Sequence, residues 1–257
     1  MIRWLIHFLR AAYRFVFPPA CALCGAEMGS LTLRYDNRYV TPVLCPTCAE
    51  AVSPKPDNPC QRCGIPLGPY VMSEDGCLYC RTRDFRFERL IRFGLYEEAL
   101  RDAVIFGKSP HAQPLSAALA NQFWITQREQ FAAENIDVVT PVPRFWTRRL
   151  WHDHNQSETL ARILARLLRV RFGRTLLHKM RFTPDQSDLS AADRKQNLKN
   201  AFAVWFGRWS LRGKTVLLVD DILTTGTTAN ECTKTLLRAG AKRVVVAVLA
   251  VVPPPSR

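Results

Sequence analysis

The sequence predicts an α/β protein with a mainly parallel sheet flanked by helices, preceded by a small cysteine-rich domain. Short apolar runs alternate with helical patterns from about residue 86 onward, as in parallel sheets. Eight of the nine cysteines lie between residues 21 and 80. We expect three parts: an amphipathic N-terminal helix over 1–20, a cysteine-rich domain over 21–84 and an α/β domain over 85–257.

The composition favours anionic partners. The 257 residues include 36 basic and 22 acidic side chains, which gives a formal charge of +14. This balance favours encounter with nucleic acid, polyphosphates or a membrane surface. No run of 18 apolar residues occurs, so we expect no transmembrane segment and a cytoplasmic location.

The first residues are apolar but do not read as a signal peptide. Arg10 interrupts the apolar run, and Pro18-Pro19 stands where a cleavage motif would be. Trp4, Leu5, Phe8, Leu9 and Ala12 form one helical stripe. An amphipathic helix docked on the protein explains this stripe, and a helix that binds a membrane surface or a partner is the alternative.

Four Cys-x-x-Cys pairs predict two structural zinc sites. Two thiolates three residues apart bind one tetrahedral metal together, and two such pairs complete a Cys₄ site. We expect the first pair to join the second and the third to join the fourth, because this closes shorter loops. A disulfide framework needs an oxidising compartment, for which no export signal is visible, and a redox pair is the other alternative. The expected ligands are Cys21, Cys24, Cys45, Cys48, Cys60, Cys63, Cys77 and Cys80.

The elements of the α/β part follow from apolar periodicity. The predicted strands are Leu90–Tyr96, Ile136–Thr140, Leu176-Leu177 and Ala201–Phe206. The predicted helices are Glu97–Phe106, one through Leu115 and Phe123, and one from Leu160 to Leu168.

Ligands of parallel sheets bind where strands end, so the connecting loops are of interest. They include Phe106–Ser109 and Pro143–Gln156. In the second loop we expect His152 and His154 to be exposed, and metal ligation by these two histidines is the alternative. The polar stretch 179–199 is either a mobile cover or a solvated loop.

The last third of the chain carries the clearest unit. Val216–Val219 is predicted to be a buried strand, and Thr228–Ala239 a helix that stops at Gly240. A second buried strand follows over Arg243–Val252. This order of elements normally forms a right-handed parallel crossover. The acidic pair Asp220-Asp221 and a Thr/Gly cluster are expected in the loop between the first strand and the helix.

The residues of this loop suit a sugar phosphate. Backbone N–H groups at a helix N-terminus bind phosphate, and Gly226 allows close approach of the backbone. No Lys-containing P-loop pattern is present, which argues against a nucleoside triphosphate. The carboxylates suit sugar hydroxyls or a hard cation such as Mg²⁺. The alternative without a ligand is that the acidic pair and the Thr/Gly cluster serve only as turn and helix-cap residues. The expected phosphate ligands are Thr224, Thr225, Gly226, Thr227 and Thr228.

This stretch resembles the phosphoribosyl-pyrophosphate (PRPP) loop of type I phosphoribosyltransferases. Together with the four cysteine pairs, it makes the chain look like the ComF family, which is linked to DNA uptake in competent bacteria. The resemblance extends to Pro141-Val142-Pro143, Asn155-Gln156, Thr183–Leu189 and Arg194–Phe202. It implies a phosphoribosyltransferase-like fold, in which Asp220 and Asp221 act as catalytic carboxylates that contact the ribose and the Thr/Gly loop holds the 5′-phosphate.

The chain departs from the family pattern in two segments, and the loss of a lysine in one of them bears on turnover more than on PRPP binding. His152-Asp153-His154 replaces the usual Arg-Gly-Phe, and Val104-Ile105-Phe106 replaces a Leu-Lys-Phe segment. With that lysine missing, Gly107 and Lys108 are the candidate residues for the pyrophosphate.

The resemblance implies a PRPP- and Mg²⁺-dependent transferase, with an unidentified acceptor, that acts in DNA uptake or nucleotide metabolism. The alternative is a non-catalytic protein with a vestigial or regulatory PRPP site that binds single-stranded DNA or DNA-processing partners. Aromatic and basic residues alternate from Arg144 to Trp151, which suits base stacking, although a basic surface loop with core-anchoring aromatics is the slightly favoured explanation.

Overall fold

The computed structural model describes residues 20–28, 35–36, 39–40, 43–68, 76–81, 83–144, 154–181, 198, 200–205 and 210–254. The predicted N-terminal helix therefore lies outside the described residues apart from Ala20. The same holds for most of the polar stretch 179–199, for residues 145–151 of the basic aromatic segment and for His152.

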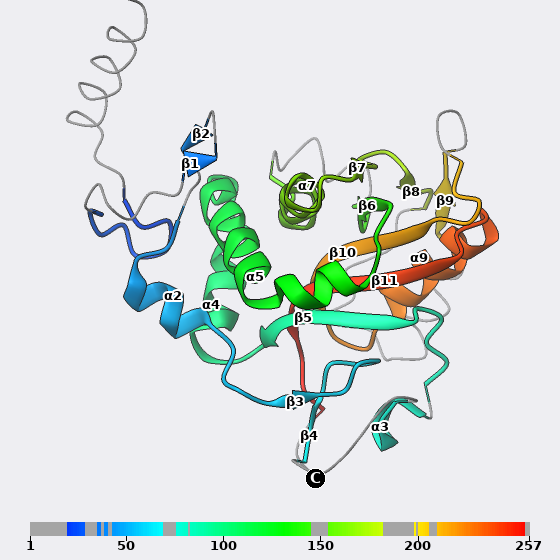
Figure 1. Ribbon diagram of the computed structural model, residues 1–257, viewed down its shortest axis with the longest axis horizontal. Helices are drawn as coiled ribbons and strands as arrows, with labels where there is room; N and C mark the ends of the chain where they lie inside the picture. Colours follow the sequence, from blue (N-terminus) through cyan, green and yellow to red (C-terminus); the bar gives the residue numbers. More distant parts are fainter. Residues whose placement is uncertain are drawn as a thin grey trace, which may run out of the picture.

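A five-stranded sheet forms the centre of the molecule (Figure 1), and all neighbouring strands run parallel. The strand order is β5-β11-β10-β6-β7. This confirms the expected α/β fold. The strands are β5 Arg89–Leu95, β6 Val138–Pro141, β7 Arg171–Phe172, β10 Thr215–Leu223 and β11 Arg243–Val251.

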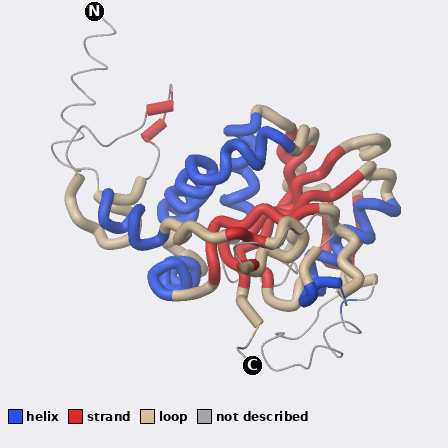
Figure 2. The backbone as a smooth tube through the Cα atoms, turned by 60° about the horizontal axis from the view of Figure 1, so that its bottom comes forward, coloured by secondary structure: helices blue, strands red, loops and turns tan. Residues whose placement is uncertain are grey.

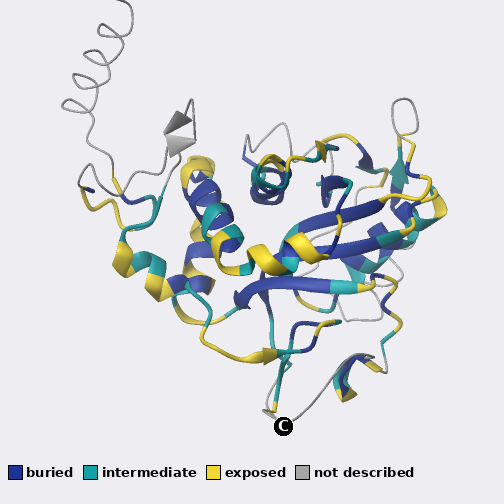
Figure 3. Ribbon diagram, in the orientation of Figure 1, coloured by how far each residue is buried: buried dark blue, intermediate teal, exposed yellow. Residues whose placement is uncertain are grey.

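Helices cover both faces of the sheet. On one face, α4 (Glu98–Phe106), α5 (Gln113–Ala133) and α7 (Gln156–Leu168) enclose a core with alternate strand residues such as Leu217 and Val245. On the other face, α9 (Thr227–Arg238) packs on Val216 and Val246. Figure 3 shows β10 and β11 buried over most of their length, as expected for the central strands of such a sheet.

The strand β10 is longer than the apolar run predicts. Ile222 and Leu223 pair with Ala250 and Val251 of β11, so the ladder continues beyond Val219. Asp220 and Asp221 therefore belong to the last part of a strand, and the loop position expected for them is wrong. The expectation that the loop Phe106–Ser109 lies at the end of a strand is also wrong, because the turn at Gly107 and Lys108 follows helix α4.

The cysteine-rich part consists mostly of loops, as Figure 2 shows, and its regular elements are short. A further hairpin, of β8 and β9, lies beyond β7 in the chain. No helix among the described residues combines the length and apolar character that crossing a bilayer requires. The short elements are β1 Tyr35–Asp36, β2 Tyr39–Val40, α2 Pro46–Val52, β3 Asn58–Pro59, β4 Pro66–Leu67, α3 Leu78–Arg81, β8 Leu177–Lys179 and β9 Phe202–Val204.

Candidate functional site

The eight paired cysteines gather into two groups of four. The first cluster contains Cys21, Cys24, Cys45 and Cys48, and the second cluster contains Cys60, Cys63, Cys77 and Cys80. The pairing of neighbouring pairs expected from loop length is thereby confirmed. All of these cysteines are free thiols, as is the buried Cys232 on α9.

The sulfur positions fit zinc. Sulfur atoms lie 3.8 Å apart in Cys24–Cys45 and Cys60–Cys80, and 3.5 Å apart in Cys63–Cys77. A tetrahedron with Zn–S bonds of about 2.3 Å has edges of about 3.8 Å. A disulfide would bring two sulfur atoms to about 2.05 Å. Both clusters are therefore compatible with structural Cys₄ zinc sites.

The two clusters differ in exposure. Cys24 of the first cluster is exposed, whereas all four cysteines of the second are buried. Burial, together with the neighbouring thiols, raises the pKa of Cys80 to about 11. In the first cluster, burial acts in the same direction, but backbone N–H groups, among them those of Cys24 and Cys45, lower the pKa of Cys21 to about 6. A divalent cation would stabilise the thiolate form in both clusters.

We expect purified protein to contain two zinc ions per chain, one for each cluster. Elemental analysis of the protein, combined with mass spectrometry of alkylated cysteines, measures both the metal and the disulfide content. Zinc content near zero together with disulfide bonds among these cysteines would contradict the assignment.

The acidic pair lies at the end of β10 and is half-buried. Asp220 Oδ1 accepts hydrogen bonds from Ser157 Oγ and from the Asp221 backbone N–H, both at 3.0 Å. Asp221 Oδ2 lies 3.3 Å from Lys108 Nζ. Burial, followed by the charge of Asp221, raises the pKa of Asp220 to about 8. Lys108 alone therefore does not offset the burial and mutual repulsion of the two carboxylates, and a bound cation could add the missing positive charge.

The Thr/Gly loop follows directly and leads into α9. Gly226 is the N-cap of this helix, with a φ angle of +75°, and Thr225 Oγ1 lies 2.9 Å from Thr227 Oγ1. The N-terminal N–H groups of α9 thus lie one short turn beyond the acidic pair, where a helix attracts anions. Thr224 is exposed at the tip of the loop.

Two residues that sequence reasoning missed support this loop from behind. Arg83 Nη1 donates a hydrogen bond of 3.1 Å to the Thr225 carbonyl. A Cβ atom on Gly226 would lie 2.6 Å from Phe85 Cε1. Glycine is therefore required by the positive φ angle and by the Phe85 ring, in addition to any approach of a phosphate. The only hint in the sequence is that both residues closely follow Cys80.

The turn at Lys108 is anchored by buried polar groups. Ser116 Oγ donates a 3.3 Å hydrogen bond to the Gly107 carbonyl and lies 2.9 Å from His154 Nε2. The expectation of an exposed His154 is wrong, because its ring packs beside α5 and is only 6% exposed. Burial lowers the pKa of His154, which favours the neutral ring. Gly107 also packs directly against the Gln156 side chain. The turn is thereby held next to the first turn of α7, from which Ser157 reaches Asp220.

A cavity of about 370 Å³ lies beyond the end of β6, the strand that pairs with β10. The Trp205 ring is 66% exposed and lies 5.8 Å from the His178 ring. Glu158 at the cavity wall forms an ion pair of 2.6 Å with Arg174. No spacing in the sequence indicates this aromatic pair, which the β8–β9 hairpin brings together. The lining residues include Pro141, Arg144, Asn155, Arg174, His178, Lys179 and Trp205.

Comparisons with known proteins agree with this picture. Residues 153–255 match the phosphoribosyl transferase domain family, which confirms the expected phosphoribosyltransferase-like fold. The chain is 29% identical over 206 residues to competence protein F of Haemophilus influenzae, and 33% identical over 207 residues to the DNA utilization protein YhgH of Salmonella typhi. Each alignment covers 79% of this chain and 88% of the relative.

A solved structure of glutamine PRPP amidotransferase from B. subtilis, complexed with ADP and GMP, is also similar. It is 25% identical, with a TM-score of 0.32, and the match covers 59% of this chain and 26% of that enzyme. This chain thus spans about a quarter of that enzyme's length.

Proposed function

Because the chain belongs to the family of competence protein F and the DNA utilization protein YhgH, we propose that it binds PRPP with Mg²⁺ and acts in the cytoplasm in the uptake or utilization of DNA. A role in nucleotide metabolism would use the same site. The reaction that this site would support is transfer of the phosphoribosyl group to an acceptor, with release of pyrophosphate.

The observation that carries the proposal is the acidic pair placed one short turn before a helix N-terminus. Asp220 and Asp221 offer carboxylate oxygens for two neighbouring ribose hydroxyls, and the first N–H groups of α9 with the Thr225 and Thr227 hydroxyls offer donors for the 5′-phosphate. A sugar phosphate engages both halves of the site at once, whereas a free phosphate would have no hydroxyl group for the carboxylates to bind.

The carboxylate donors also fit Mg²⁺, which prefers oxygen ligands and is usually bound by one or two carboxylates plus substrate phosphates. The raised pKa of Asp220 indicates that the pair needs further positive charge. When bound, Mg²⁺ would neutralise the charge of the pyrophosphate and of Asp220 and Asp221.

The surrounding residues have separate tasks in this proposal. Ser157 orients Asp220 through its 3.0 Å hydrogen bond. Lys108, whose side chain is 42% exposed, is free to turn from Asp221 to the pyrophosphate. Positive charge that develops on the ribose ring as pyrophosphate leaves would be stabilised by the nearby carboxylates. The acceptor would enter from the cavity beside β6.

The binding proposal is tested by thermal unfolding in the presence of PRPP and Mg²⁺. Ligand that binds only the native state raises the melting temperature by mass action. We expect a shift of several degrees for the wild type and its loss in Asp221→Asn, because this change removes a charge that holds the ribose and the cation. Asp102→Asn is the matched control, since Asp102 is exposed on α4, and it should retain the full shift. A full shift in Asp221→Asn would contradict the site assignment.

A second candidate function, the binding of single-stranded DNA, is favoured by one observation. The exposed Trp205 stands at a cavity that Arg144, Arg174 and Lys179 also line. Aromatic side chains beside basic residues stack bases without strong sequence preference. This function can accompany PRPP binding or stand alone with a vestigial or regulatory PRPP site.

Trp205→Ala should weaken binding of a short single-stranded oligonucleotide about tenfold, because loss of one stacked base costs about 1–3 kcal/mol. Fluorescence anisotropy at two salt concentrations measures this, and wild-type affinity should fall steeply as salt rises. Phe106→Ala removes another exposed aromatic ring and serves as the control. Equal affinities of the wild type and Trp205→Ala would exclude the cavity as the DNA site.

A further inference from the structure

We propose that the second cysteine cluster positions the sugar-phosphate loop through Arg83 and Phe85, so that PRPP affinity depends on the metal in this cluster and not on the metal in the first. The inference rests on the proposed PRPP site. It assigns Arg83 and Phe85 as positioning residues and gives the two metal sites different roles.

The first connection runs through Arg83, three residues after Cys80. Its guanidinium lies 4.1 Å from the centre of the Tyr79 ring, and Tyr79 stands between the metal ligands Cys77 and Cys80. From this position Arg83 donates its hydrogen bond to the Thr225 carbonyl. The direction of the Thr225–Gly226 peptide, and hence of the following N–H groups, therefore depends on a side chain that the cluster holds.

The second connection runs through Phe85. Its ring faces Gly226 and stacks on Phe87 with 4.8 Å between ring centres. Arg62, which stands between the ligands Cys60 and Cys63, donates a 2.9 Å hydrogen bond to the Phe85 carbonyl. Both rings share one buried core with all four cysteines of the second cluster. Each Cys-x-x-Cys turn of this cluster thus contributes one contact to the segment behind the loop.

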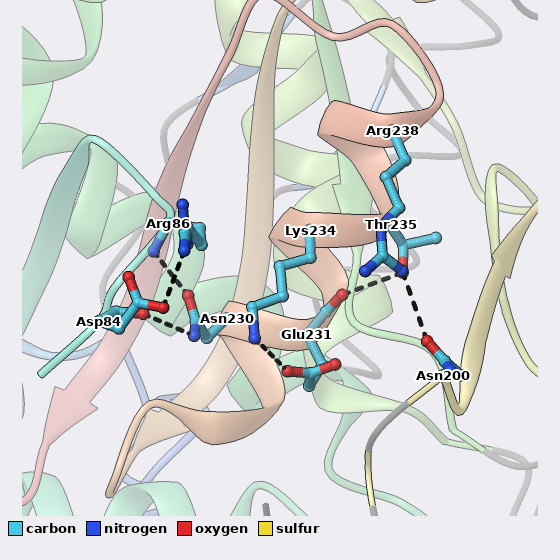
Figure 4. A network of polar contacts seen from close by, with 8 residues as sticks. All are labelled: Asp84, Arg86, Asn200, Asn230, Glu231, Lys234, Thr235 and Arg238. Carbon is cyan, nitrogen blue, oxygen red and sulfur yellow. Dashed lines mark hydrogen bonds and ion pairs between the residues drawn. The ribbon is translucent and has the colours of Figure 1, made fainter.

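A third connection joins this segment to the first turn of α9 (Figure 4). The Asn230 side-chain N–H donates a 2.8 Å hydrogen bond to the Asp84 carbonyl, and the Asn230 side-chain oxygen accepts a 2.6 Å hydrogen bond from the Arg86 backbone N–H. The Asn230 backbone N–H in turn bonds the Gly226 carbonyl at 2.9 Å. Residues 83–86 are therefore fastened to both ends of the turn that would hold the phosphate.

The first cluster packs elsewhere. Ala22, Leu23 and Leu44 next to its cysteines contact the core on the opposite face of the sheet, beneath α4 and α5. Small Cys₄ units depend on their metal for folding, so each cluster should loosen its own surroundings when the metal leaves. Loss of the metal from the second cluster should release Arg83 and Phe85 and leave the loop disordered. Binding of PRPP would then have to order the loop, and this free-energy cost would lower the affinity.

Calorimetric titration with PRPP and Mg²⁺ should separate the two clusters. We expect Cys24→Ser to retain the wild-type affinity and Cys63→Ser to lose at least about tenfold. Because a cysteine variant can fail to fold, Arg83→Ala is the second test, with an expected loss of about fivefold to tenfold. Its matched control is Arg81→Ala, an exposed residue of the same segment, which should bind as the wild type does. Arg83→Lys should restore part of the affinity, because it keeps a donor for the Thr225 carbonyl.

Zinc release provides a readout that a merely structural role would not produce. Coupling between two sites is reciprocal, so bound PRPP should slow the transfer of zinc from the second cluster to a chelator and leave release from the first unchanged. Hydrogen exchange of residues 224–230 in Arg83→Ala should be faster than in the wild type even without PRPP.

Wild-type PRPP affinity in Arg83→Ala, together with unchanged exchange at residues 224–230, would overturn the inference. Equal slowing of zinc release from both clusters would also overturn it. If the wild type binds no PRPP, the proposed function fails, and the exchange experiment still decides whether the cluster positions the loop.

Discussion

Gly226→Val should destabilise the protein by about 3 kcal/mol and abolish PRPP binding, since left-handed backbone costs a non-glycine residue about 1–2 kcal/mol and overpacking about 1–3 kcal/mol. Gly226 has a φ angle of +75°, and an added Cβ would lie 2.6 Å from Phe85 Cε1 and 3.2 Å from Phe85 Cζ. Phe85 is buried against Phe87, so it cannot move away without disturbing the core. Denaturant unfolding and PRPP titration measure the two effects.

Gly213→Val is the matched control for this change. Gly213 has nearly the same φ angle, +73°, but nothing lies within 4 Å of the position that its Cβ would take. The control should therefore show only the cost of the backbone conformation, about 1–2 kcal/mol, and should bind PRPP normally. Equal losses of stability in the two variants would show that Phe85 does not restrict the loop.

Asp220→Asn should make the ligand-free protein more stable at alkaline pH, by about 2 kcal/mol. The folded protein raises the pKa of Asp220 to about 8, through burial and then the charge of Asp221, from a value of 3.8. A carboxyl group whose pKa is higher in the folded than in the unfolded protein stabilises the fold fully at a pH below its unfolded-state pKa. This stabilisation is lost as the pH rises through the folded-state pKa. Wild-type stability should thus decline between about pH 4 and pH 8, and the asparagine variant should lack this decline.

Unfolding of both proteins across this pH range, without Mg²⁺ or PRPP, measures the difference. The cysteine clusters are the same in both proteins, so the subtraction isolates the titration of the Asp220–Asp221 pair. Because Asp220 is only half-buried, water screens part of its repulsion with Asp221. The expected gain in stability is therefore smaller than the full pKa shift of Asp220 implies. A variant that is less stable than the wild type at pH 8 would show that the carboxylate is stabilised in the folded protein.

Local patterns in the sequence predict the parts of this structure that depend on neighbouring residues. The Cys-x-x-Cys spacing and the short loops between pairs are enough to predict both clusters. The apolar run before Asp220 and the helical spacing after Gly226 predict β10 and α9. The end of β10 could not be found this way, because the ladder beyond Val219 depends on pairing with β11, about thirty residues away.

The residues that sequence reasoning missed act through contacts between distant segments. Arg83 meets Thr225 across 142 positions of sequence, and His154 meets Ser116 across 38. Trp205 is a candidate binding residue only because the β8–β9 hairpin places its ring beside His178. None of these pairs forms a recognisable sequence pattern, such as a helical period or a fixed spacing. They can therefore be identified only in the folded structure. The acidic pair was found because its two residues are adjacent, although its place in the strand was not.

The most direct test of the account is a calorimetric titration of the zinc-loaded wild type with PRPP, in the presence and in the absence of Mg²⁺. We predict one binding site per chain, with an affinity that Mg²⁺ strengthens and that Asp221→Asn removes. Absence of saturable heat at millimolar PRPP with Mg²⁺, in protein whose zinc content is complete, would contradict the assignment of Asp220, Asp221 and the Thr/Gly loop as a sugar-phosphate site.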